Sequence, residues 1–162
     1  MLSRPTFSFA GNARQNAWTP FRMGEGRAGP AGQAIYVTDL ATGETDCATW
    51  LPLRRTDADY RATFAPGVAT FTGARGTLEL EQITFVPPDA PVEVKIRRLR
   101  NHSSQPQRLR VTPVLEMVLA EAPSDSLGAI ETVSDPSGRA LFFRNPGNTF
   151  VQGFAFVATS LA

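Results

Sequence analysis

The clearest pattern in the chain is an alternation of apolar and polar residues between positions 109 and 119. Its apolar members share one parity and are Leu109, Val111, Leu115, Met117 and Leu119. The other parity carries Arg108, Arg110, Thr112 and Glu116. Successive side chains of a strand point to opposite faces, so this period of two predicts a strand with one wet side.

A second alternating segment precedes it, with Val92, Val94 and Ile96 in phase. The alternation slips by one at Arg97–Arg98, which indicates a β-bulge. Residues 101–106 (NHSSQP) separate the two segments and have turn chemistry. We therefore predict a long antiparallel hairpin over residues 92–119, with the other strands of the chain added around it.

One alternative concerns the second arm of this hairpin. Pro113 removes a ladder donor, and residues 114–122 could begin a helix with proline at its first position. The five-point alternation favours the strand.

Further short strands follow from the same pattern elsewhere in the chain. They are predicted at residues 4–10, 34–39, 45–51, 60–65, 68–72, 77–86, 128–133, 139–144 and 149–159. Pro66-Gly67 and residues 73–76 are expected to be turns, and the apolar positions of 77–86 change phase near Gln82. Residues 11–32 are expected to be a long irregular loop, which is uncommon in a compact domain and is typical of a functional or a disordered segment. About ten strands joined by short turns predict an all-β, antiparallel β-sandwich.

Composition agrees with this class and excludes others. The 162 residues predict one domain (1–162), and 13 Gly, 13 Pro and 11 Phe favour short strands and turns. A net charge of +1 gives no reason to expect nucleic acid. Because Cys47 and His102 are the only residues of their types, no internal disulfide, metal site or cofactor is predicted. No membrane insertion and no signal peptide are indicated, so we expect a cytoplasmic location.

Four segments, in order, resemble one family. They are AGNARQNAWTPF, QAIYVTDLATGE, the run ATFTGARGTLELEQITFVPPDAPVEVKIRRLRNHSSQPQRLRVTPVLEMVL, and ALFFRNPGNTF. Together they are similar to the N-terminal β-sandwich region of cyclic β-1,2-glucan synthetases, and to the related domain of the glycoside hydrolase family 94 phosphorylases acting on cellobiose and chitobiose.

The resemblance implies a galactose mutarotase-like supersandwich, here a partial one. In the family a helical (α/α)₆ barrel follows and carries the aspartic general acid and the phosphate-binding residues, for an inverting transfer at a glucosidic bond. This sequence contains no such barrel and is interpreted as a fragment of a larger N-terminal domain. Association of the parent protein with the inner membrane stays open.

No catalytic residue is predicted in the chain itself. Its acidic residues lie mostly in turns, where backbone capping explains them. The strand glutamates Glu79, Glu81, Glu93 and Glu116 are expected to face arginines on neighbouring strands. The arginines near the hairpin tip, at 97, 98, 100, 108 and 110, are interpreted as a solvated strand face before an anion site.

Two loops supply the candidate carbohydrate-binding residues. The first carries Asn12, Arg14, Asn16 and Trp18, which offer amides and a guanidinium for hydroxyls and an indole for a sugar face. A plug at the end of the sandwich explains the same residues equally well. The second carries Arg144, Asn145 and Asn148, for which a turn held by Asx hydrogen bonds is the favoured interpretation. The aromatic residues expected in the core are Trp50, Phe143, Phe150, Phe154 and Phe156.

The sequence thus predicts a non-catalytic domain of a glucan-processing glycosyltransferase or phosphorylase. Its expected partners are a glucan or oligosaccharide bound through the parent enzyme, the parent's (α/α)₆ barrel, and a second copy, since a cut sandwich leaves unpaired strand edges. A stand-alone carbohydrate-binding module and a purely structural or dimerisation sandwich remain the alternatives.

Overall fold

The computed structural model describes residues 32–120, 123–148 and 153–160, and it groups the chain into two compact units. The described part of the first unit covers residues 32–114, and that of the second begins at Leu115. Every ladder whose register is defined is antiparallel. The described residues contain no α-helix, so the all-β, antiparallel class expected from the sequence is confirmed.

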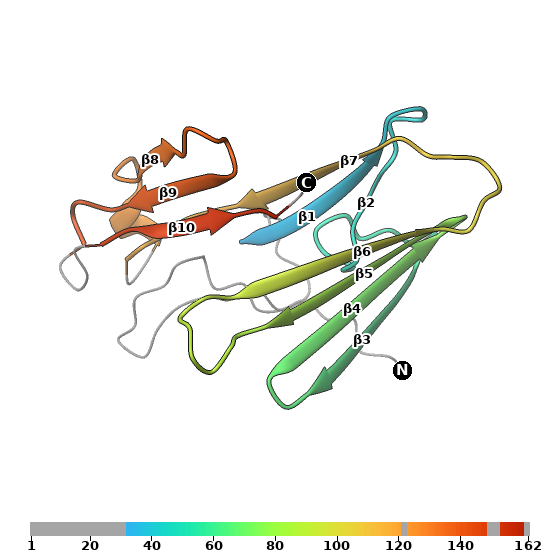
Figure 1. The fold of residues 1–162 in the computed structure, drawn as a ribbon, viewed down its shortest axis with the longest axis horizontal. Coiled ribbons are helices and arrows are strands. Elements are labelled where there is room, and N and C mark those ends of the chain that lie inside the picture. Colours follow the sequence, from blue (N-terminus) through green and yellow to red (C-terminus); the bar gives the residue numbers. More distant parts are fainter. Residues whose placement is uncertain (1–31, 121–122, 149–152, 161–162) are drawn as a thin grey trace. The chain divides into compact units, whose positions relative to one another are not determined.

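The larger sheet of the first unit is a meander of four strands. It is built from β3 (Asp59–Ala65), β4 (Val68–Arg75), β5 (Leu78–Phe85) and β6 (Val94–Asn101), in the order β3-β4-β5-β6 (Figure 1). Tight turns join the first three strands at Gly67 and Gly76, whose positive φ angles of 76° and 56° suit glycine. The predicted Pro66-Gly67 hairpin is confirmed.

The turn expected at residues 73–76 is wrong in its start, because β4 continues through Gly73. A Cβ atom on Gly73 would lie 2.6 Å from the carbonyl oxygen of Cys47 and 3.0 Å from the ring of Tyr60. This glycine therefore serves a close approach of neighbouring chain segments, and the turn comes only at Gly76.

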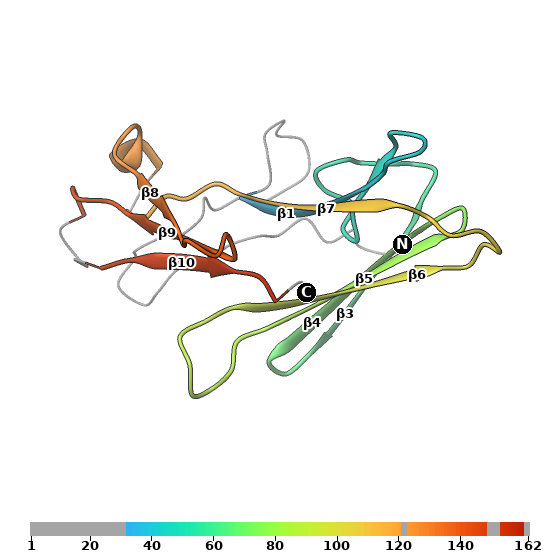
Figure 2. The ribbon, with the colours of Figure 1, turned by 45° about the horizontal axis from the view of Figure 1, so that its top comes forward.

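The smaller sheet of the first unit has the order β2-β1-β7. It comprises β1 (Gln33–Asp39), β2 (Thr45–Asp46) and β7 (Leu109–Leu115), so the return strand expected over residues 45–51 is much shorter than predicted. Figure 2 shows β1 and β7 on one side of the four-stranded sheet. Between the two sheets lies a core of Val37, Ala48, Leu78 and Leu80, with Phe71, Leu109 and Val111 packed against it.

The long hairpin predicted over residues 92–119 is wrong. Its first arm, β6, pairs with β5, and its second arm, β7, is placed in the other sheet beside β1. The connection between the arms is hydrogen-bonded to the turns beside both sheets. His102 N donates to Thr77 O just before β5, and Leu40 N, just after β1, donates to Arg108 O, each at 2.8–2.9 Å. Alternation identified both strands but could not identify their partners.

The β-bulge predicted at Arg97–Arg98 is also absent, because the β5–β6 register runs without interruption from Leu78↔Asn101 to Phe85↔Val94. The slip in the pattern has another cause. Arg97 pairs with Gln82, and both lie on the face that carries Leu80, so polar side chains occupy the inner face where the sequence suggested apolar ones.

The second unit contains a three-stranded sheet in the order β10-β9-β8. Its strands are β8 (Glu131–Ser134), β9 (Ala140–Arg144) and β10 (Ala155–Ala158), and a 3₁₀ helix, η1 (Pro123–Ser126), precedes them. The helix considered over residues 114–122 is not formed at the described positions, where β7 ends at Leu115 and the chain continues without helix to Ala120.

The predicted aromatic core is confirmed at one position and wrong at two. Phe143 is buried, whereas Phe154 and Phe156 are 63% and 54% exposed. Trp50 is half-buried, and Phe150 lies outside the described residues. The pairs Val133↔Phe142 and Phe142↔Phe156 place Phe156 on the face of the sheet opposite to that of Phe143. Because Phe143 and Phe156 point to opposite faces of the sheet, a core on one face cannot contain both.

Candidate functional site

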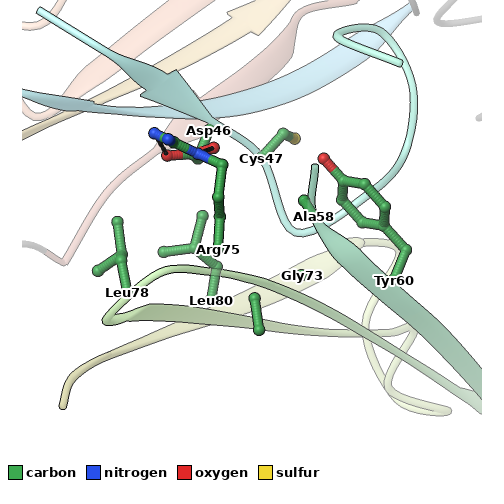
Figure 3. Close-up of a pocket in the computed structure, with 9 residues that line it drawn as sticks. Asp46, Cys47, Ala58, Tyr60, Gly73, Arg75, Leu78 and Leu80 are labelled. Carbon is green, nitrogen blue, oxygen red and sulfur yellow. Dashed lines mark hydrogen bonds and ion pairs between the residues drawn. The ribbon is translucent and has the colours of Figure 1, made fainter. Parts of the chain in front are cut away.

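A shallow depression in the first unit is lined by residues of β2 to β5 and the segments beside them (Figure 3). Its lining includes Asp46, Cys47, Tyr60, Gly73 and Arg75. The empty volume is about 170 Å³, a figure that includes open solvent. Sites for small molecules are typically larger, from about 300 Å³ upward, so this depression does not enclose a sugar.

The charged side chains of the depression form a tight ion pair. Arg75 Nε and Nη2 each donate to one carboxylate oxygen of Asp46 at 2.8 Å, and Nη2 lies 2.7 Å from Glu44 Oε2. Arg55 Nε is 3.4 Å from Asp46 as well. Hydrogen bonds to Asp46 and then Glu44 raise the pKa of Arg75 above its ordinary value. Such a two-pronged pair fixes the geometry of β2 against β4 and leaves Asp46 fully engaged as an acceptor.

Cys47 and Tyr60 are the other reactive groups of the depression. The Cys47 thiol is buried, donates to Ile35 O at 3.3 Å, and lies 3.3 Å from the Thr49 hydroxyl. Burial, followed by the charge of Asp46, raises the pKa of the Tyr60 phenol. The raised pKa keeps the Tyr60 phenol protonated at neutral pH, and the Cys47 thiol is held by the backbone carbonyl of Ile35. In the part of the chain that the structure describes, no three His, Cys, Asp or Glu side chains are grouped so that they could hold a metal ion.

A second polar cluster lies on the inner face of β6 and was not predicted. Arg97 Nη2 donates to Ile35 O at 2.9 Å and to Gln82 Oε1 at 3.0 Å, and burial lowers the pKa of Arg97. Lys95 Nζ donates to Gln33 and to Glu93, and burial lowers its pKa to about 8. Both cations join β6 to β1 across the core. The phase change at Gln82, taken together with the slip at Arg97, is the signal from which this polar cluster could have been found.

The sequence-predicted site residues fall in two places. Asn12, Arg14, Asn16 and Trp18 lie outside the described residues. Arg144 ends β9, and its Nε donates to Glu131 Oε2 at 2.6 Å, while its guanidinium lies 5.9 Å from the ring centre of Phe154.

Asn145 and Asn148 have a common structural partner in the second unit. Both side-chain amides donate to the carbonyl oxygen of Leu119, at 3.2 Å and 2.7 Å, and both residues are buried. Gly147 N also donates to Asn145 Oδ1 at 3.0 Å, which is the Asx hydrogen bond expected in the turn. Leu119 itself has a left-handed φ of 47°, so the two amides secure an unusual backbone conformation. Sugar binding by these two residues stays a prediction.

No helix among the described residues has the length and apolar character required to cross a bilayer.

Comparison with known proteins gives a relationship that covers most of the chain. The cyclic beta-(1,2)-glucan synthase NdvB of Rhizobium meliloti (strain 1021) is 28% identical to it over 140 residues. That alignment covers 86% of this chain but only 5% of the relative.

The family comparison covers more of the chain than this alignment. The sequence model of the glycosyl hydrolase 94 supersandwich domain matches residues 5–161, almost the entire length. The match agrees with the antiparallel sheets described above and with the resemblance found in the sequence. The chain belongs to the glycosyl hydrolase 94 supersandwich domain family.

Proposed function

We propose that this chain is a non-catalytic β-sandwich domain of a larger glucan-processing glycosyltransferase or phosphorylase. The observation that carries the proposal is the family match over residues 5–161, joined to the similarity with a cyclic glucan synthase of which the chain spans 5%. The domain's role is to support the catalytic barrel and the sugar site of its parent. The single-domain extent 1–162 and the cytoplasmic location expected from the sequence stay predictions.

The chemistry of the described carboxylates supports a non-catalytic role. Inverting transfer at a glycosidic bond needs a carboxylic acid that keeps its proton near neutral pH. Four strand or strand-end carboxylates instead accept hydrogen bonds from arginines, in the pairs Asp46–Arg75, Glu79–Arg100, Glu81–Arg98 and Glu131–Arg144. His102 and then Arg100 lower the pKa of Glu79. The lowered pKa favours the ionised form of Glu79, which cannot donate a proton, and the other three carboxylates are each occupied by an arginine. We therefore assign the general acid to another part of the parent.

The sugar site of the parent is proposed to receive the first loop, with Asn12, Arg14, Asn16 and Trp18. In the second loop, the amide groups of Asn145 and Asn148 already serve Leu119, whereas Arg144 keeps a half-exposed side chain beside Glu131. An arginine held by a carboxylate presents its remaining N–H groups in a fixed direction, which suits hydroxyl recognition. Arg144 is therefore the member of the second loop that we retain as a candidate for sugar contact.

The non-catalytic proposal is tested directly on the purified chain. We expect no release of glucose 1-phosphate when it is incubated with β-1,2-linked gluco-oligosaccharides and phosphate, and no chain extension when an activated glucose donor replaces the phosphate. Phosphorolysis or transfer by the chain alone would overturn the proposal.

The first loop is tested in the full-length parent with Trp18→Ala. We expect turnover of the glucan to fall at least tenfold while the thermal unfolding temperature changes little. Trp50→Ala is the matched control, because Trp50 is half-buried and its ring lies 5.7 Å from the guanidinium of Arg54. A Trp18→Ala enzyme with unchanged turnover would remove the loop from the sugar site.

The free-standing binding module is separated from this proposal by titration. Addition of a β-1,2-glucan to the isolated chain is expected to leave tryptophan fluorescence nearly unchanged, because the sugar site needs the parent. Saturable quenching that Trp18→Phe abolishes would instead favour the module.

A further inference from the structure

The outer face of the β5–β6 ribbon carries an ordered pattern of side chains. Leu78 and Leu80 belong to the core and therefore identify the inner face. The residues of opposite parity therefore point outward, and the register sets them in four rows: Glu79↔Arg100, Glu81↔Arg98, Ile83↔Ile96 and Phe85↔Val94. We call these eight residues the outer ribbon. It has a charged half and an apolar half.

The charged half is divided by strand. Both of its acids are on β5 and both of its arginines are on β6, and each row is closed by an ion pair, Arg100–Glu79 at 2.7 Å and Arg98–Glu81 at 2.8 Å. The arginine side chains are more than half exposed, at 56% and 55%. A half-buried acidic column thus stands beside an exposed basic column.

The apolar half is partly accessible, and Ile83, Phe85 and Val94 are half-buried. Ile96 is 40% exposed, and Val68, which pairs with Phe85 from the neighbouring strand β4, is 39% exposed. Figure 2 shows β1 and β7 on the inner side of this sheet, away from the outer ribbon. Apolar side chains that are contiguous on an outward face, rather than scattered singly, mark an interaction surface.

We propose that the outer ribbon binds the outer ribbon of a second copy of this chain. A two-fold axis that runs along the strands, midway between β5 and β6, places β5 of one copy over β6 of the other. Glu81 then faces Arg98 of the second copy, and Glu79 faces its Arg100. The apolar rows face apolar rows, because this rotation leaves positions along the strands unchanged. The surface is complementary to itself in both charge and polarity.

Other face-to-face arrangements lack this match. A two-fold axis across the strands would set the Glu79↔Arg100 row against the Phe85↔Val94 row and would bury ion pairs under apolar side chains, which is costly. Packed sheets cross at about 30°, and an axis tilted by half of that angle from the strands keeps the central rows opposed.

The size of the outer ribbon determines how tightly the two copies are expected to bind. Two strands of eight residues cover a ribbon about 10 Å wide and about 26 Å long. That area is well below the roughly 800 Å² per partner of a standard interface, so the dimer belongs to the weak, reversible class. We expect it to form in the micromolar-to-millimolar range and to weaken as salt concentration rises, because its charged half is screened.

Charge reversal with mixing tests the geometry. Arg98→Glu and Glu81→Arg each set like charges against each other across the axis, so each variant alone is expected to dimerise at least tenfold more weakly than the wild type in sedimentation velocity. An equimolar mixture of the two variants restores attraction at both contacts. In the mixed pair the native Glu81 of one variant faces the native Arg98 of the other, and the two introduced side chains, which are opposite in charge, face each other. The mixture is therefore expected to regain dimer, as a heterodimer that a fluorescent label on one variant identifies.

A control separates this result from damage to the fold. Each single reversal also sets like charges across neighbouring strands of its own sheet, so far-UV circular dichroism and thermal unfolding are measured for both variants. The double variant Glu81→Arg/Arg98→Glu keeps the pair within the sheet and across the axis, and is expected to dimerise like the wild type. A wild type that stays monomeric up to millimolar concentration would overturn the proposal. So would a mixture that associates no better than its components, or a dimer that neither reversal weakens.

Discussion

The two faces of the four-stranded sheet carry similar polar side chains and use them in different ways. On the inner face, Arg97 donates to the backbone of β1 and to Gln82, and burial lowers its pKa. On the outer face, Arg98 is 55% exposed and pairs with Glu81. The two arginines are consecutive in sequence, so burial and partner, more than residue type, decide what each contributes.

This difference separates structural polar groups from available ones. A buried donor or acceptor that loses its partner costs about 1–3 kcal/mol, whereas an exposed ion pair contributes about 0–1 kcal/mol. The inner polar groups are therefore committed to joining the two sheets. The outer ones can be changed at little cost to stability, which leaves them free to interact with a partner.

The largest effect is expected for the inner apolar row. Leu80 is 1% exposed in the core, and its cross-strand neighbour Leu99 is 37% exposed. We expect Leu80→Ala to lower the free energy of unfolding by up to about 5 kcal/mol, because it removes buried methyl groups and leaves a cavity. Leu99→Ala, the matched control, should cost much less. Urea unfolding of both variants makes the measurement, and equal losses would contradict the assignment of the core.

A smaller loss is expected for the ion pair of the depression. Asp46 is 6% exposed and accepts two hydrogen bonds from Arg75. Asp46→Asn leaves that guanidinium only Glu44 as a charged partner, and we expect a loss of about 3 kcal/mol, since breaking a buried pair is more costly than never forming it. Glu44→Gln is the control, because the Glu44 side chain is 49% exposed. Equal losses of stability for the two variants in chemical unfolding would show that the Asp46–Arg75 pair contributes no more than an exposed ion pair.

The inner cation Lys95 predicts a dependence of stability on pH. Burial lowers its folded-state pKa to about 8, below the value of about 10.4 of an unfolded chain. Between these values the unfolded state binds more protons than the folded state, so folding stability rises as pH increases from about 8 to about 10. Below pH 8 both states hold the proton and the effect is flat.

Lys95→Met removes this titration and provides the reference. We expect the stability of the wild type relative to Lys95→Met to increase by roughly 2 kcal/mol over that range, as measured by urea unfolding at several pH values. Tyr60 titrates in both proteins and cancels in the difference. A difference that stays constant with pH would show that burial does not depress the Lys95 pKa.

The sequence predicted the strands whose signals are local. β3 and the start of β4 follow from alternation around Pro66-Gly67, and the Asx turn at Asn145 follows from residue chemistry within four positions. Such local signals could not predict which distant segments pair with each other. Alternation in residues 92–101 and 109–115 marks two strands, but it carries no information on whether they pair with each other or with β5 and β1.

The same limit of local sequence patterns applies to the candidate site. The bonds from Asn145 and Asn148 to Leu119 O span 26 and 29 positions, and neither could be deduced from the turn itself. The slip at Arg97–Arg98 is visible in the sequence but favours a bulge there, because a buried arginine facing an apolar core is the less common alternative. A polar residue on an inner face looks like a change of register until its partner is known.

The smallest effect is expected where the outer face is changed alone. Arg98→Ala removes an ion pair whose arginine is 55% exposed, so the free energy of unfolding should fall by less than about 1 kcal/mol. Arg97→Ala is the matched control one residue away, and it should cost about 1–3 kcal/mol, because Ile35 O and Gln82 Oε1 both lose a donor. Urea unfolding at low protein concentration keeps self-association out of both measurements. Equal losses of unfolding free energy in the two variants would contradict the view that the inner arginine is structural and the outer one is not.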